Sequence, residues 1–141
     1  MGRLKDIRIL LLEDDVETLS LLLQCLYKLQ KHFEDRLSIA ITVLSEYTQV
    51  EEYLNKVSRN VFDIILLDRD CFASGSFHVL DFNKYPPNKI IGISSIPPYN
   101  QELEAKGVKR IVWKDYQNLH AFVEQVKGHL EEMLLQTLGR S

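Results

Sequence analysis

Residues 61–70 read VFDIILLDRD, and this run decides the fold class of the chain. Apart from Asp63, the run is apolar as far as residue 67. Such a nearly continuous apolar run is typical of a strand that helices cover on both faces, and these strands belong to parallel sheets. We therefore expect a central parallel strand over 61–68, with Asp68 at its carboxyl end.

Three further apolar runs end on charged or hydroxyl residues: ILLLEDD at 9–15, KIIGISS at 89–95 and VKRIVWKD at 108–115. The carboxyl ends of parallel strands meet at one edge of the sheet. That edge is therefore expected to gather Glu13, Asp14, Asp68, Ser94 and Lys114. Three carboxylates, one hydroxyl and one amine suit a divalent cation and a phosphoryl group.

Helices are expected between these strands. Apolar residues at three- and four-residue steps predict one helix over 16–33, capped by Asp14 or Asp15, and another over 116–138. The remaining elements are a β-branched strand at 37–45 and shorter helices at 47–59, 76–84 and about 98–106, where Asn60 and Gly107 follow the first and last of these helices. Five βα units in sequence predict an α/β fold, a doubly wound parallel sheet with helices on both faces, in one domain over 1–141.

The composition fits a globular domain rather than a membrane or nucleic-acid-binding protein. The 141 residues are 45% hydrophobic and 26% charged, with a net charge of −3 and no basic cluster. No apolar run approaches the roughly 20 residues of a membrane span, so we expect a cytoplasmic protein. Cys25 and Cys71 lack metal-ligand spacing and are interpreted as reduced structural thiols.

The predicted cluster has the chemistry of an aspartyl phosphoacceptor. An aspartate accepts a phosphoryl group when the transferring charge is spread onto a metal and fixed donors. Mg²⁺ is a hard cation that prefers oxygen ligands, and it relieves the repulsion between neighbouring carboxylates. Lys114 supplies the opposite charge and Ser94 a hydroxyl donor. We therefore predict Mg²⁺ as cofactor and Asp68 as acceptor.

An acidic pair after the first strand, a lone Asp after the third, a Ser after the fourth and a Lys after the fifth resemble the receiver domain of response regulators, over roughly residues 5–138. The resemblance implies a flavodoxin-like sheet of strand order 2-1-3-4-5. It also implies a stand-alone signalling domain, not an enzyme, that is phosphorylated on Asp68 by a histidine kinase or histidine phosphotransfer protein. The phosphorylated domain would then contact a downstream protein.

The resemblance also implies roles for the clustered residues. Glu13, Asp14 and Asp68 would bind Mg²⁺ together with the backbone carbonyl of Asp70. Ser94 and Lys114 would contact the phosphoryl group.

The chain departs from the family pattern after the acceptor and around Lys114. Cys71 and Phe72 stand where the family has an apolar residue and then Pro, and Asp115 replaces the usual Pro after the Lys. Ile111 replaces the usual aromatic residue, and Trp113, two residues on, lies on the same side of the strand. The chemistry is expected to be retained and the usual output coupling to differ.

Three alternatives remain open. The run IILLDRDCF also fits the opening motif of haloacid-dehalogenase-like phosphatases, with Asp68 as nucleophile and Asp70 as acid, although that motif normally lies on the first strand. Glu13 with the Asp68-x-Asp70 pair resembles the Toprim metal site, but no Gly follows Glu13. A receiver-like domain that binds partners without being phosphorylated is the third.

The length of the last helix raises the question of a homodimer. Residues 116–138 would span roughly 34 Å, against roughly 20 Å for a six-residue strand. Four apolar residues continue into the expected overhang: Leu130, Met133, Leu134 and Leu138. Either the helix packs back onto the domain, or the stripe and the Ile111/Trp113 side of the last strand form a homodimer interface.

Overall fold

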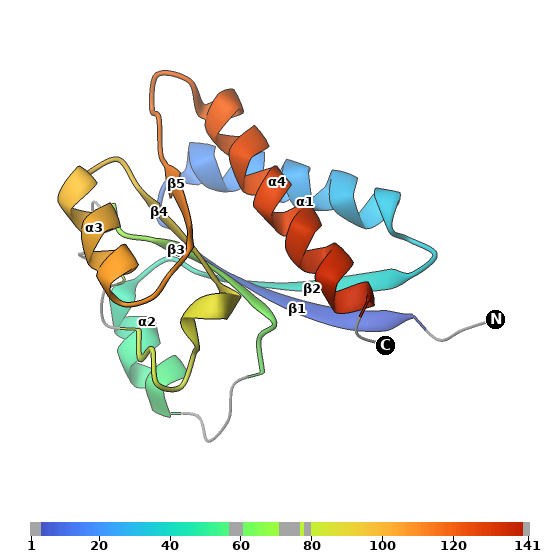
Figure 1. The fold of residues 1–141 in the computed structure, drawn as a ribbon, viewed down its shortest axis with the longest axis horizontal. Helices are drawn as coiled ribbons and strands as arrows, with labels where there is room; N and C mark the ends of the chain where they lie inside the picture. The colour runs from blue at the N-terminus through green and yellow to red at the C-terminus, as the bar shows by residue number, and fades with distance from the viewer. Residues whose placement is uncertain (1–3, 57–60, 71–76, 78–79, 140–141) are drawn as a thin grey trace.

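The computed structural model describes residues 4–56, 61–70, 77 and 80–139, and shows a five-stranded parallel sheet between two layers of helices (Figure 1). The strands are β1 (Lys5–Leu12), β2 (Leu37–Leu44), β3 (Ile64–Asp68), β4 (Ile90–Ser94) and β5 (Arg110–Trp113). Their order in the sheet is β2-β1-β3-β4-β5, with all neighbours parallel. The predicted flavodoxin-like topology is confirmed.

The helices lie on both faces of this sheet, as expected for right-handed crossovers. They are α1 (Val16–His32), α2 (Tyr47–Glu52), α3 (Pro97–Ala105) and α4 (Leu119–Leu138), with 3₁₀ turns η1 (Leu54–Lys56) and η3 (Pro87–Lys89). The core residues of α1 and α4 pack on one face, and those of α2 and α3 on the other. Within the described ranges, no helix has both the length and the apolar character needed to cross a bilayer.

Strand β3 is the centre of both cores. All five of its residues are buried. Ile64 and Leu66 face the layer of α1 and α4, whereas Ile65 and Leu67 face the layer of α2 and α3. Burial of one such side chain stabilises the fold by about 1.5–3 kcal/mol, so β3 fixes the position of Asp68 at its end.

Helix α1 begins where the sequence predicts. Asp15 is its N-cap, and its carboxylate accepts a hydrogen bond from the backbone N–H of Thr18 at 3.2 Å. Of the two proposed caps, the structure therefore selects Asp15 and leaves Asp14 for the cluster at the strand ends. The buried face of α1 carries Leu22, Leu26 and Leu29 at the expected helical spacing.

Three helix predictions are corrected. Helix α2 ends at residue 52 and η1 follows, while residues 57–60, with Asn60, lie outside the described part. The helix predicted at 76–84 is wrong for residues 80–84, which are irregular at 80–81 and form a turn at 82–84. Phe77 has a 3₁₀ conformation, and residues 76, 78 and 79 lie outside the described part. Asp81 accepts from the N–H of Asn83 at 2.9 Å, a local bond that competes with helix formation. Helix α4 begins three residues late because Asn118 caps it through the N–H of Ala121.

The expected overhang of α4 is also wrong. Leu130, Met133 and Leu134 are buried in the core shared with α1, and Leu138 packs against that core. The last turns of α4 lie beside the start of β1, where the ammonium of Lys5 donates to the carbonyl of Thr137 at 3.1 Å (Figure 1). Since β1 and β2 have eight residues each, the sheet is long enough to support the helix. The apolar residues at the end of α4 are therefore part of the core, and they give no support to a dimer through α4.

Candidate functional site

The predicted residues meet at the carboxyl edge of the sheet. Glu13 follows β1, Asp68 and Ser94 end β3 and β4, and Lys114 follows β5. All four side chains are at most 2% exposed. Such polar groups are rarely buried unless they are paired, so their partners define the site.

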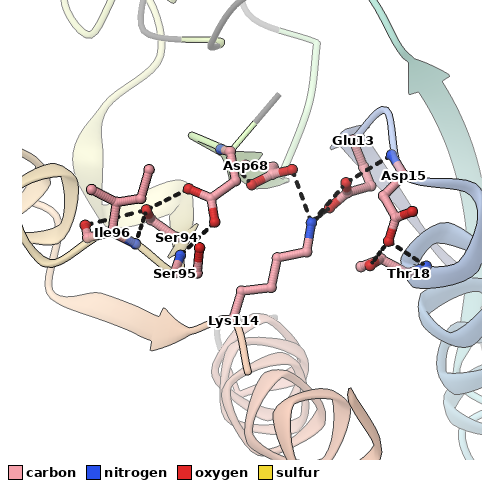
Figure 2. A network of polar contacts seen from close by, with 9 residues as sticks. Glu13, Asp15, Thr18, Asp68, Ser94, Ser95, Ile96 and Lys114 are labelled. Carbon is pink, nitrogen blue, oxygen red and sulfur yellow. Dashed lines mark hydrogen bonds and ion pairs between the residues drawn. The ribbon is translucent and has the colours of Figure 1, made fainter. Parts of the chain in front are cut away.

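Lys114 lies between two carboxylates (Figure 2). Its ammonium donates to Glu13 at 3.0 Å and 3.2 Å and to Oδ2 of Asp68 at 3.2 Å. Burial acts to lower the pKa of Lys114, but the charges of Asp68 and Glu13 outweigh it and raise the pKa above its usual value. Lys114 is therefore a fixed positive charge directed at Asp68.

Burial raises the pKa of both carboxyl groups. Burial, followed by the charge of Asp68, raises the pKa of Glu13 to about 9. Burial also raises the pKa of Asp68, against the opposing effect of Glu13 and Lys114. A single ammonium thus lies between two buried carboxyl groups, and a divalent cation at the same place would supply the further positive charge that favours their ionised forms.

Three of the acidic residues can hold a metal ion. Glu13, Asp14 and Asp68 each offer a carboxylate oxygen, and these oxygens lie within 4.8 Å of one another. Asp14 is half-buried, so water can complete the coordination shell on its side. An all-oxygen set with room for water fits a hard divalent cation such as Mg²⁺. The sequence prediction of this group is therefore supported by its geometry.

The carboxylate of Asp70 contacts Ser94 and Ser95. It accepts from the hydroxyl of Ser94 at 2.6 Å and from the N–H of Ser95 at 2.5 Å. The N–H of Asp70 donates to Oδ1 of Asp68 at 2.8 Å. The hydroxyl of Ser94 thus donates to Asp70 in this structure. The predicted metal role of Asp70 concerned its backbone carbonyl and stays a prediction, as does the phosphoryl contact of Ser94.

The replacement of Pro by Asp115 does not misdirect Lys114. The peptide bond between them is trans, and the ammonium still reaches both carboxylates. Ile111 packs against the core of α2 and α3, while Trp113 is 63% exposed. Trp113 therefore lies on the surface, next to Lys114 in the sequence. Cys71 and Phe72 fall outside the described residues.

Sequence reasoning missed two residues around the cluster. The ring of Tyr116 lies 5.0 Å from the ammonium of Lys114, and burial raises the pKa of its hydroxyl to about 12, so it stays protonated. Arg69 is 5% exposed, and its guanidinium contacts Glu102 of α3 at 3.2 Å. The position of Arg69 between two aspartates was visible in the sequence. Its direction was not, because it depends on where α3 packs.

Comparison with known proteins supports the fold. No protein-family model and no curated protein sequence matches the chain. Solved structures do match: the bacteriophytochrome response regulator AtBRR at a TM-score of 0.57 and 22% identity, over 90% of this chain and 94% of that one. The Mn²⁺-bound response regulator Rcp1 matches at 0.66 and 17%, over 86% and 90%. A receiver domain from Rhodospirillum rubrum matches at 0.63 and 14%, over 89% and 94%.

The chain has the receiver-domain fold. At 14–22% identity these likenesses establish the architecture. Glu13, Asp68 and Lys114 lie at the strand ends where the resemblance in the sequence placed them.

Proposed function

We propose that this chain is a response-regulator receiver domain that accepts a phosphoryl group on Asp68 in a Mg²⁺-dependent reaction. The donor would be a histidine kinase or histidine phosphotransfer protein, and a downstream protein would respond to the change. One observation carries the proposal: the buried ammonium of Lys114 lies between the carboxylates of Asp68 and Glu13. A buried carboxylate paired with a fixed cation beside a metal-binding set is the arrangement that phosphoryl transfer requires.

The proposed reaction begins at the carboxylate of Asp68. One of its oxygens attacks the phosphorus of the donor's phosphohistidine, the P–N bond breaks, and the imidazole leaves with the bonding electron pair. Lys114 is placed to neutralise the charge that Asp68 gains as an acyl phosphate. Glu13 and Asp14 would hold Mg²⁺ with the Asp70 carbonyl, and the bound ion supplies further charge stabilisation.

Ser94 would act after the phosphoryl group arrives. Its hydroxyl now donates to Asp70 at 2.6 Å. A phosphoryl oxygen on Asp68 is a competing acceptor that carries more negative charge, and such charge-assisted bonds are the stronger ones. We therefore infer that Ser94 leaves Asp70 when Asp68 is phosphorylated, which would change the structure at the end of β4.

We further propose that the chain is a signalling domain and not an enzyme. We also propose that it acts in the cytoplasm and binds only protein partners. We infer no binding to nucleic acid, because the net charge is −3, and no membrane association.

The test is incubation with Mg²⁺ and acetyl phosphate, followed by intact-mass measurement. We expect one added phosphoryl group per chain, and none after removal of Mg²⁺ with a chelator. Asp68→Asn should abolish the labelling. The matched control is Asp63→Asn, which changes an acid at the other end of the same strand, where it accepts from the N–H of Arg8.

Other outcomes distinguish the alternatives. Labelling that persists in Asp68→Asn would move the acceptor elsewhere. Continuous release of phosphate from a monoester would favour the phosphatase. A protein that takes no label and still binds its partner would be the receiver-like module that works without phosphorylation.

A further inference from the structure

Strand β2 forms an edge of the sheet and lacks the features that usually keep an edge strand from pairing with another chain. It lies at one end of the strand order, and its residues 40–43 are exposed. Edge strands of natural proteins usually carry charges, Pro or bulges, or are very short. The sequence of β2, LSIAITVL, has eight residues with neither charge nor Pro. The opposite edge, β5, has four residues and begins with Arg110, which pairs with Glu132 at 2.6 Å.

The backbone groups that β2 turns outward can be identified from its bonds to β1. The carbonyls of Arg36 and Leu44 accept from the N–H groups of Lys5 and Glu13. In a parallel ladder every second residue bonds to the same neighbour, so the even-numbered residues of β2 face β1. The odd-numbered residues in the middle of the strand therefore point outward: Ile39, Ile41 and Val43. In the described structure the ends are already bonded, since the N–H of Leu37 donates to Phe33 and that of Ser45 to Gln49.

We propose that β2 pairs antiparallel with β2 of a second copy of this chain, about a two-fold axis at Ile41. In this register Ile41 faces its own counterpart, and Ile39 faces Val43 of the second copy. All three outward residues then form hydrogen-bonded pairs, each of which exchanges two backbone bonds. A shift of two residues would leave an outward residue without its pair. The two sheets would become one continuous sheet.

Charge complementarity favours a second copy in this register. Arg36 lies one residue before β2, at the end of a turn, and its carbonyl already bonds to β1. Glu46 lies two residues after β2 and has extended backbone angles of −130° and 136°. Both side chains are exposed. Each lies five positions from Ile41, so the two-fold axis places Arg36 opposite Glu46 of the second copy at both ends of the paired strands. Opposite charges at facing positions stabilise a strand pair.

Apolar side chains on one face of β2 support the same pairing. Ile41 and Val43 are 39% and 36% exposed, and they lie on the sheet face that α1 covers. Helix α1 also exposes Leu23 and Tyr27. These two residues lie on the side away from α4, because the opposite side, with Cys25, borders the groove between α1 and α4. The two-fold axis would bring this apolar strip against its counterpart and remove it from water.

The first test changes the residue on the axis. Analytical ultracentrifugation over a range of concentrations should show the wild-type chain as a dimer that dissociates on dilution. Ile41→Lys places two ammonium groups opposite each other and should weaken the dimer about fivefold. The matched control is Leu135→Lys, which removes an exposed leucine from α4 and should behave as wild type. A wild-type chain that is monomeric throughout, or a dimer that survives Ile41→Lys, would overturn the proposal.

A charge swap tests the register. Arg36→Glu alone and Glu46→Arg alone should each weaken self-association, because like charges then face each other. When the two variants are mixed, both charge pairs of a mixed dimer are attractive, so mixed dimers should predominate. An equal tendency to form mixed and unmixed dimers would refute the register. Circular dichroism checks that Glu46→Arg, which alters the capping box of α2, remains folded.

Amide hydrogen exchange tests the backbone bonds directly. On raising the protein concentration, the amides of Ile39, Ile41 and Val43 should become protected. Those of Ala40 and Thr42 should not change, because they already bond to β1. Association without this alternation would rule out pairing through β2.

Discussion

Replacement of Lys114 by Met tests whether the buried cation holds the site together. Met matches the length and volume of Lys but carries no charge. The wild-type ammonium is 3.0 Å from Glu13 and 3.2 Å from Asp68, and all three side chains are almost fully buried. Its loss leaves two carboxyl groups in a buried site without the positive charge that compensates them.

The expected cost follows from this burial. Removal of one partner from a buried ion pair typically costs about 3–5 kcal/mol of stability. We expect the lower end, about 3 kcal/mol, because a buried carboxyl group that loses its cationic partner can take up a proton instead of remaining charged. For a chain of this size that free energy lowers the melting temperature by about 10 °C.

The assay is urea unfolding followed by far-UV circular dichroism at neutral pH, without divalent metal. Lys106→Met is the matched control. Lys106 forms an exposed pair with Glu102 at 3.4 Å, and the same substitution there should cost no more than about 1 kcal/mol. The difference between the two variants isolates the effect of burial from that of losing a lysine.

Magnesium provides a second arm of the same experiment. A divalent cation bound by Glu13, Asp14 and Asp68 supplies the charge that Lys114→Met removes. Mg²⁺ should therefore raise the melting temperature of this variant more than that of the wild type. If Lys114→Met unfolds at the wild-type urea concentration, the ammonium is not stabilising the cluster. If Mg²⁺ stabilises neither protein, the acidic group is not a metal site.

Two further predictions concern the neighbouring acids. Isothermal titration calorimetry should show weak Mg²⁺ binding that is lost in Asp14→Asn and kept in Asp15→Asn, because Asp15 caps α1 and Asn is an equally good cap; equal binding by both variants would exclude Asp14 as a ligand. Asp70→Ala should lower the free energy of unfolding by about 2 kcal/mol, because the hydroxyl of Ser94 and the N–H of Ser95 lose their buried acceptor. Unchanged urea unfolding of that variant would show that the contact has no energetic role.

The topology could be predicted because four of the five strands are followed by, or end on, a charged or hydroxyl residue of the site. The apolar run before Asp68 and the runs before Glu13, Ser94 and Lys114 have the composition of strands covered on both faces, and their order predicts the parallel sheet. The elements that were wrong depend on contacts between distant segments. The N–H of Asp81, in the segment wrongly predicted as a helix, donates to the side-chain oxygen of Asn55 at 3.0 Å. The C-terminal end of α4 is buried because it packs over α1 and the eight-residue β1.

In the site, the sequence predicted where each residue lies along its strand but not the direction in which its side chain points. Strand register places Ser94 near Asp68, but it does not determine which acid the hydroxyl contacts. Asp70 accepts that bond because the chain continues past β3 with its N–H directed to Asp68 and its carboxylate toward Ser95. Spacing along the sequence carries no information about this rotation.

The low sequence identity and the shared fold have one physical explanation. In a doubly wound sheet most positions need only an apolar residue of suitable size, and many sequences satisfy that requirement. The carboxyl ends of the strands are different, because a buried charge there is tolerated only with its partner. Lys114 without Glu13 or Asp68 would be a buried unpaired ion, and the same holds for each acid. These positions depend on one another, so they can keep their residue types while the surrounding core changes. This is why a few residues, widely separated in the sequence, predicted the site when no family model matched the chain.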